Sequence, residues 1–406
     1  MRAKKYIVVL GDGMADYPVA EFGGKTVLET AHKPNMDEMA RYGEMGLVRT
    51  VLPGMKPGSD VANLSVMGYD TRRCYSGRSP LEAASMGVAL TDMDVTFRTN
   101  LVTLSQGLEY SQKTMLDYSA GEISTEEAKQ LIAAVEEALH TELLHFYPGV
   151  SYRHLLVWHG GSTKVQLTPP HDISDQKITD YLPKGEGAPE LLAMMQKSEE
   201  ILKNHPVNQA RIAAGKNPAT SIWIWGEGTK PDLENFYEKY GKRASVISAV
   251  DLIKGIAKCA GMLSIDVPGA TGNYDTNFAG KAQAALDTLL DGQDLVYVHL
   301  EAPDECGHQG DAVHKKYAVE MIDEKIIGFL RRELEARGID YKMLVLPDHP
   351  TPIRLKTHVS DPVPYVIYDS ANQLERQETA YTEKNAEAAG RFIAEGHSLM
   401  ARFLED

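Results

Sequence analysis

Carboxylate and imidazole side chains in three separate parts of the sequence are the groups best suited to chemistry. They are Asp12 near the N-terminus, Asp304 with His308, and Asp348 with His349 and the later His358. Oxygen and imidazole ligands suit divalent Mn, Zn, Fe or Mg-like cations. Because Asp304 and His308 are spaced at i and i+4, they project from the same face of a helical turn and can bind one cation. The three clusters therefore indicate a metal site.

Ser59 is the candidate nucleophile. It follows Pro57-Gly58, and the segment 60–67 is expected to begin a helix at this point. The free N–H groups at a helix N-terminus favour a phosphate, although a serine at such a position also serves as a simple N-cap. A cation bound to the hydroxyl would lower its pKa and make Ser59 a nucleophile.

Predicted buried strands precede the metal clusters. Short apolar runs, each leading into a polar loop and separated by helical patterns, lie at 6–10, 295–300, 343–346 and 365–368. The repeated order of strand, polar loop and helix predicts a parallel α/β sheet, in which ligands bind outside the carboxyl ends of the strands. A lone Asp after a strand is usually a turn former or a helix cap. It is the coincidence of three clusters at such ends that favours a metal site.

The middle of the chain, at 91–266, is predicted to be an inserted second domain. Helical patterns at 125–140 and 188–204 alternate there with Pro- and Gly-rich breaks, and Asp/His clusters are fewer. The first domain is then discontinuous and consists of 1–90 and 267–406.

The composition narrows the class of partner. The net charge is −15, which argues against nucleic acid and anionic membranes as partners because both need a basic surface. A small anion still fits, since cations can reverse the field within one cleft. Three cysteines do not make a disulfide framework, and no apolar run is long enough to span a membrane. We expect a cytoplasmic protein acting on a small phosphorylated molecule, with an oligomeric state that the sequence does not define.

Taken together, these pieces resemble the cofactor-independent phosphoglycerate mutases of the archaeal type, in the alkaline-phosphatase superfamily, over essentially the whole chain. The matching strings lie at 9–16, 58–70, 305–308, 347–349 and 358–364. The resemblance implies an alkaline-phosphatase-like, doubly wound α/β domain with an inserted, smaller α/β substrate domain. It also implies interconversion of 3- and 2-phosphoglycerate without 2,3-bisphosphoglycerate.

The resemblance further implies two divalent cations. Mn²⁺ is expected, with Zn²⁺, Mg²⁺ and Co²⁺ as alternatives. One ion would be held by Asp12, Ser59, Asp348 and His349, and the other by Asp304, His308 and His358. Ser59 would accept the phosphoryl group to form a phosphoserine, and Asn63 would help to orient the phosphate.

The inserted domain departs from the family pattern at two motifs. The family has Asp-Arg-x-Ala-Gly-Arg where this chain runs from Asp117 to Glu122, and Arg-Gly-x-Gly where it begins with Trp225. Arginines there would bind a carboxylate or phosphate in bidentate fashion, whereas a glutamate suits an ammonium group. The alternative is therefore a homoserine kinase-type phosphotransferase in threonine biosynthesis, a proposed branch of the family. The candidate substrate contacts in the insertion are Asp117, Glu122, Arg153, His154, Arg211 and Trp225.

Overall fold

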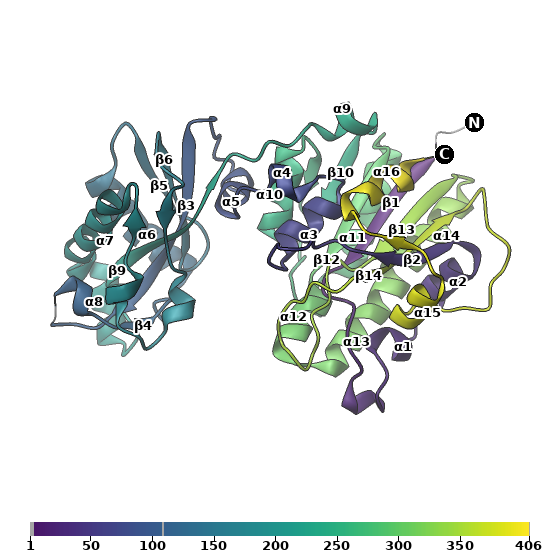
Figure 1. The fold of residues 1–406 in the computed structure, drawn as a ribbon, viewed down its shortest axis with the longest axis horizontal. Coiled ribbons are helices and arrows are strands. Elements are labelled where there is room, and N and C mark those ends of the chain that lie inside the picture. Colours follow the sequence, from purple (N-terminus) through teal and green to yellow (C-terminus); the bar gives the residue numbers. More distant parts are fainter. Residues whose placement is uncertain (1–3, 108, 406) are drawn as a thin grey trace. The chain divides into compact units, whose positions relative to one another are not determined.

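The computed structural model describes residues 4–107 and 109–405, and the chain packs as two compact units (Figure 1). The first unit consists of Met1–Tyr75 and Asp232–Asp406, and the second of Ser76–Pro231. The second unit thus begins and ends earlier than the insertion expected at 91–266. It ends earlier because strand β10 (Ala244–Ile247) pairs with a central strand of the first unit and so belongs to that unit. The segment 267–272, directly after the expected end of the insertion, is a loop inside the first unit.

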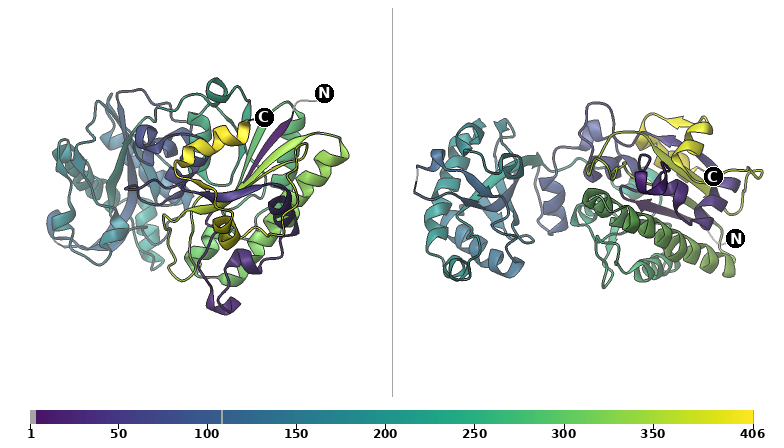
Figure 2. Two further views of the ribbon diagram at one scale, coloured as in Figure 1. Left: turned by 45° about the vertical axis from the view of Figure 1, so that its right-hand side comes forward. Right: turned by 90° about the horizontal axis from the view of Figure 1, so that it is seen from below.

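The first unit is built on an eight-stranded mixed sheet (Figure 1, Figure 2). In spatial order its strands are β11 (Leu263–Ile265), β10, β12 (Leu295–Leu300), β1 (Lys5–Gly11), β13 (Tyr341–Leu346), β14 (Val363–Asp369), β2 (Glu44–Val48) and β15 (Phe392–Ile393). The central strands β12, β1 and β13 are parallel and are apolar on both faces, as buried parallel strands must be.

Helices cover both faces of this sheet. Ile7 and Val9 of β1 face a core formed with α2 (Pro34–Tyr42), α11 (Phe278–Leu290), α13 (Ala312–Met321) and α14 (Gly328–Ala336). On the opposite face, Tyr6 packs edge-on against Phe403 of α16 (Leu399–Leu404). The predicted α/β class is therefore confirmed.

Strand β14 differs from the prediction that all four apolar runs are parallel. It runs antiparallel to both β13 and β2. An apolar run does not encode its direction, because both directions bury the same side chains. Because β14 is reversed, its N-terminal end lies on the same side of the sheet as the C-terminal ends of β1, β12 and β13. The loop that carries His358 comes directly before β14 and therefore lies at these C-terminal strand ends.

The second unit contains a separate antiparallel sheet with helices against it. Its strands are β3 (Asp94–Leu104), β4 (Met115–Asp117), β5 (Leu144–Tyr147), β6 (Arg153–His159) and β9 (Ser221–Thr229). Helices α6 (Thr125–Leu139) and α7 (Ala188–Lys203) contribute to the core of this unit, close to the predicted helices at 125–140 and 188–204.

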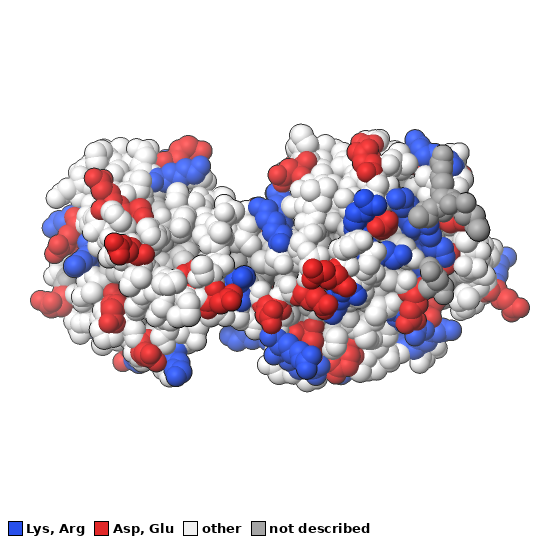
Figure 3. Space-filling model, turned by 90° about the horizontal axis from the view of Figure 1, so that it is seen from above, with Lys and Arg blue, Asp and Glu red and all other residues white. Residues whose placement is uncertain are grey.

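The surface and the cysteines agree with the composition. Acidic and basic side chains are interspersed on the face shown in Figure 3. Cys74 and Cys306 are buried free thiols. In the part of the chain that the structure describes, no helix combines the length and apolar character needed to cross a membrane.

Candidate metal centre

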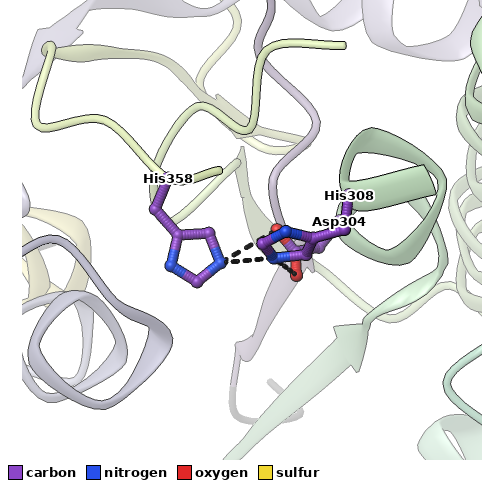
Figure 4. Close-up of side chains that lie close together, drawn as sticks. All are labelled: Asp304, His308 and His358. Atoms are coloured by element: carbon purple, nitrogen blue, oxygen red, sulfur yellow. Dashed lines mark hydrogen bonds and ion pairs between the residues drawn. The ribbon is translucent and has the colours of Figure 1, made fainter. Parts of the chain in front are cut away.

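Asp304, His308 and His358 converge on one point (Figure 4). Asp304 and His308 lie one turn apart on α12 (Ala302–Gln309), and His358 lies in the loop before β14. His308 Nε2 is 3.2 Å from Asp304 Oδ2, and His358 Nε2 is 3.4 Å from Asp304 Oδ1. The two Nε2 atoms are 2.8 Å apart, so at most one of them carries a proton between the rings. Facing imidazole nitrogens beside a carboxylate form a suitable set of cation ligands.

A second cluster adjoins the first through Asp304. Donor atoms of Asp12, Asp304 and His349 all lie within 4.8 Å of one another. His349 Nε2 is 3.6 Å from Asp12 Oδ1 and 3.4 Å from Asp348 Oδ2. Asp12, Asp348 and His349 are 0% exposed. The elements responsible are β1 and β13, whose neighbouring carboxyl ends place these loops side by side.

The electrostatics of these clusters fit divalent cations. Asp12 Oδ1 is buried and has no hydrogen-bond partner among the described residues. Burial, together with the nearby charges of Asp348, Glu301 and Asp304, raises the pKa of Asp12 well above its usual value. A hydrogen bond to Asp304 raises the pKa of His308 to about 9. Without cations, protons must therefore offset the concentrated negative charge, and a divalent cation would replace them.

Ser59 lies beside the second cluster, as expected. Helix α3 (Ser59–Val66) begins at this residue, and Ser59 Oγ is 3.2 Å from His349 Nε2. Ser59 is therefore the first residue of α3, and the N-terminus of a helix is a position that favours a phosphate.

Asn63 is held by protein groups on every side rather than open to a phosphate. Its Nδ2 donates to Asp348 Oδ2 and to the carbonyl of Ser59, each at 2.9 Å. Its Oδ1 accepts from the Tyr297 hydroxyl at 2.7 Å, and the residue is 0% exposed. Asn63 therefore orients Asp348, and the geometry does not place it against substrate.

Two residues of β12 and its loop were missed in the sequence. His299 Nε2 is 2.9 Å from Asp12 Oδ2, and its Nδ1 lies 3.2 Å from Ser248 Oγ. Glu301 Oε2 is buried, lies 3.7 Å from His299 Nε2 and has no hydrogen-bond partner among the described residues. The signal was present, because a histidine and a glutamate inside and after an apolar run are unusual for a buried strand.

In the second unit, Asp117 and Arg211 are engaged in local structure. Asp117 accepts from Ser119 N and from Asn217 Nδ2, each at 2.8 Å. Arg211 is 2% exposed and donates to Glu127 Oε2 at 2.8 Å and to the Asn217 carbonyl at 2.9 Å. These groups hold the loop together, so Arg211 is not free to bind an anion.

His154 and Glu122 occupy opposite environments. His154 is 3% exposed, on the face of β6 that carries the core residue Leu156. Its Nδ1 accepts from Gly149 N at 3.1 Å, and burial lowers the pKa of the ring to about 3. Glu122 is exposed and has a left-handed backbone with φ of 48°. The interior position of His154 argues against the predicted substrate contact.

Trp225 and Arg153 belong to an aromatic and cationic group on the second sheet. Trp225 lies directly opposite Arg98 in the β3–β9 pairing, and the Arg98 guanidinium carbon is 4.3 Å from the centre of its ring. Arg153 is exposed on β6, with its guanidinium carbon 5.5 Å from the ring centre of Tyr152. Burial, with like charges including that of Arg153, lowers the pKa of Arg98. The Arg98 guanidinium therefore lies over the ring of Trp225, at the position where the family motif has an arginine.

Comparisons with known proteins agree on one family. The model of the family described as 2,3-bisphosphoglycerate-independent phosphoglycerate mutase matches residues 40–208. A Geobacter sulfurreducens protein, described as a probable enzyme of that name, is 51% identical over 401 residues, which cover 99% of this chain and 100% of the relative. The enzyme of that name from Methanothrix thermoacetophila is 48% identical over 396 residues, or 98% of each chain.

Solved structures give the same picture of the fold. A Pyrococcus horikoshii protein aligns with a TM-score of 0.82 and 28% identity, covering 100% of this chain and 97% of its own. A cofactor-independent phosphoglycerate mutase from Thermoplasma acidophilum aligns with a TM-score of 0.69 and 23% identity, covering 99% of this chain and 100% of its own. The second likeness concerns the fold alone.

Proposed function

Because this chain belongs to the family of 2,3-bisphosphoglycerate-independent phosphoglycerate mutases, we propose that its buried carboxylate and imidazole clusters bind two divalent cations beside a phosphoryl-accepting serine. Its activity is that of the family, the isomerisation of phosphoglycerate. Because this reaction belongs to glycolysis, we propose that the protein acts in the cytoplasm.

The proposed ligands follow the two clusters. One cation would be held by Asp12, Ser59, Asp348 and His349, and the other by Asp304, His308 and His358. Mn²⁺ is the proposed ion, with Zn²⁺, Mg²⁺ and Co²⁺ as alternatives, because the donors are carboxylate oxygens and imidazole nitrogens without a thiolate. The observation that carries the proposal is the convergence of two imidazole nitrogens and a carboxylate at Asp304, His308 and His358.

Ser59 is proposed to take the phosphoryl group from substrate. When bound, two cations supply charge stabilisation at the attacking and leaving oxygens of an in-line displacement. The Ser59 hydroxyl loses its proton and its oxygen forms a bond to phosphorus as the bond between phosphorus and the 3-oxygen of the substrate breaks. The 3-oxygen takes up one proton and leaves as a hydroxyl, so the step is neutral in protons. The N-terminal N–H groups of α3 favour the negative charge of the resulting phosphoserine.

The second half of the reaction reverses these bonds at a different oxygen. The 2-hydroxyl of the retained glycerate attacks phosphorus, loses its proton, and displaces Ser59, which regains a hydroxyl. The phosphoryl group that Ser59 takes from the substrate returns to the same glycerate, so no external phosphoryl donor is needed. This accounts for independence from 2,3-bisphosphoglycerate. His349, whose Nε2 is 3.2 Å from Ser59 Oγ, holds the serine oxygen in place throughout. Asn63 Nδ2 donates both to the Ser59 carbonyl and to Asp348 Oδ2 and so fixes the backbone of Ser59 relative to Asp348.

The second unit is proposed to supply anion contacts to the substrate through Arg98 and Arg153. The family motif has an arginine at position 225, whereas this chain has a tryptophan there with Arg98 lying over its ring. The neighbouring strand thus supplies a guanidinium. Its Nε donates to Glu82 Oε2 at 3.1 Å, and its terminal amino groups, unlike those of Arg211, are proposed to bind the anion. Guanidinium groups suit carboxylate and phosphate. This favours phosphoglycerate, which carries both anionic groups, over homoserine, which carries one carboxylate and an ammonium group.

The test is a comparison of two reactions with one enzyme preparation in Mn²⁺. Conversion of 3- to 2-phosphoglycerate, followed by coupling to enolase, is expected to be fast without added 2,3-bisphosphoglycerate. ATP-dependent phosphorylation of homoserine is expected to be undetectable. Robust homoserine phosphorylation with no phosphoglycerate conversion would overturn the proposal.

A further inference from the structure

Lys315 of α13 is a buried lysine that lies outside the set of proposed cation ligands. It is 0% exposed, which is rare for lysine unless the charge is paired. Its ammonium group donates to Asp16 Oδ2 at 2.7 Å, to the Thr351 carbonyl at 2.8 Å and to the Ala15 carbonyl at 3.4 Å. All three N–H donors of the ammonium are thereby used, and the side chain is held in a single geometry.

The oxygens that Lys315 contacts come from two loops that carry proposed cation ligands. Ala15 and Asp16 belong to the loop after β1, which begins with Asp12, and Thr351 belongs to the loop after β13, which contains His349. The carboxylate of Asp16 also accepts from the backbone N–H of Ile353, at 3.3 Å. Lys315 and Asp16 together therefore join the two loops at their bases.

Thr351 connects this junction to the ligands themselves. Its carbonyl accepts from Lys315, while its hydroxyl donates to Asp304 Oδ1 and lies 3.3 Å from His349 Nδ1. The loops are in direct contact here, because a Cβ on Gly13 would lie 2.6 Å from Thr351 Oγ1 and 2.7 Å from Asp304 Oδ1. A displacement of Thr351 would thus move ligands of both proposed cations.

We propose that Lys315 is a positioning residue that fixes the separation of the two ligand-bearing loops and so sets the affinity of the cation site. The inference rests on the proposed function, since it concerns the cations proposed there. Lys315 is not itself a ligand, because a protonated ammonium group has no lone pair to offer. Groups that orient metal ligands typically change metal affinity by about 10- to 100-fold when they are removed.

The experiment measures Mn²⁺ binding to the metal-depleted, full-length protein by the electron paramagnetic resonance signal of free Mn²⁺. We expect Lys315→Met to bind Mn²⁺ about 10- to 100-fold more weakly than wild type. Mutase activity of the variant should recover as the Mn²⁺ concentration is raised. The matched control is Lys33→Met, which removes another buried lysine of the same unit, 3% exposed and paired with Asp37 at 2.6 Å. Its Mn²⁺ affinity should equal that of wild type.

Removal of Lys315 alone leaves the carboxylate of Asp16 buried without its cation, which is destabilising. A second variant, Lys315→Met with Asp16→Asn, removes both charges, and circular dichroism establishes that it is folded. Weak Mn²⁺ binding by the folded double variant supports the inference, and wild-type affinity in either folded variant overturns it. Failure of the wild-type protein to bind Mn²⁺ would instead overturn the proposed cation site.

Discussion

Ser59 Oγ lies 3.2 Å from Nε2 of His349, a residue 290 positions later in the chain. The contact arises because α3 begins at Ser59 while the loop after β13 presents His349 at the carboxyl edge of the first sheet. It places the candidate nucleophile against one of the two ligand clusters. Phosphoryl transfer to Ser59 depends on this contact.

Asp304→Asn should greatly weaken cation binding, because Asp304 contributes to both clusters. We expect at least about a 100-fold loss of Mn²⁺ affinity, comparable to the loss of a directly coordinating group of about 3 kcal/mol or more. Isothermal titration calorimetry on the metal-depleted protein measures the change. The control is Asp311→Asn, since Asp311 caps α13 through His314 N at 3.0 Å and asparagine also caps helices. Unchanged Mn²⁺ affinity in Asp304→Asn would show that the clusters are not cation sites.

Ser59→Ala should abolish the phosphoenzyme. Mass spectrometry of wild-type protein quenched during turnover is expected to show one phosphate on Ser59, and the variant should show none and lose mutase activity. The matched control is Ser65→Ala on the same helix, because the buried Ser65 hydroxyl has no hydrogen-bond partner in the described part of the chain. Normal turnover by Ser59→Ala would remove the serine from the mechanism.

Arg98→Met should lower kcat/KM for 3-phosphoglycerate by about 10- to 100-fold, the effect of losing one charge-assisted hydrogen bond of about 1.5–3 kcal/mol. The change also removes the ion pair of Arg98 Nε with Glu82 Oε2, at 3.1 Å. Because Glu82 keeps a second partner in Arg78, at 3.0 Å, the fold should tolerate the change. Steady-state kinetics measure the effect. The control is Lys129→Met, which removes an exposed positive charge from α6 of the same unit. Equal loss in both variants would point to net charge rather than to a specific contact.

His154 should make the second unit sensitive to acid. Burial lowers the pKa of the ring to about 3 in the folded state, whereas the unfolded chain takes up the proton near pH 6.5. Between these values the unfolded state binds more protons, so the free energy of unfolding is full above pH 6.5 and falls as pH decreases towards 3. The slope contributed by this residue is about 1.4 kcal/mol per pH unit.

Tryptophan fluorescence during urea unfolding measures this slope. Trp158, Trp223 and Trp225 all belong to the second unit, so the signal reports on that unit. His154→Gln should flatten the pH dependence between 4 and 6, while the exposed control His140→Gln should leave it unchanged. A slope that persists in His154→Gln would assign the acid sensitivity to other groups.

The sequence was sufficient to predict the elements that carry the metal clusters, because buried strands ending in polar loops leave a clear apolar pattern. Asp12, Asp304 and Asp348 each follow such a run, and the structure brings their side chains together. The direction of β14 was not predictable, since a short apolar run buries the same side chains in either direction. The boundary of the insertion was also missed, because the strand at 244–247 resembles any other short apolar run.

Contacts between strands account for the other differences. Arg98 compensates in space for the tryptophan at 225, but the two residues are far apart in the sequence and meet only through the pairing of β3 with β9. Asn63 and His154 have the right chemical character for substrate binding, yet one is enclosed by hydrogen bonds and the other faces the core. Residue type predicts what a side chain can bind, whereas burial decides whether a ligand reaches it.

The two-cation site beside Ser59 is tested most directly by an anomalous difference map from crystals of the wild-type protein loaded with Mn²⁺. We predict two peaks in the first unit. One should be bounded by Asp304, His308 and His358, and the other by Asp12, Asp348, His349 and the Ser59 hydroxyl. A map without peaks at these side chains, from crystals whose Mn²⁺-loaded protein is active, would contradict the two-cation site and the role of Ser59 within it.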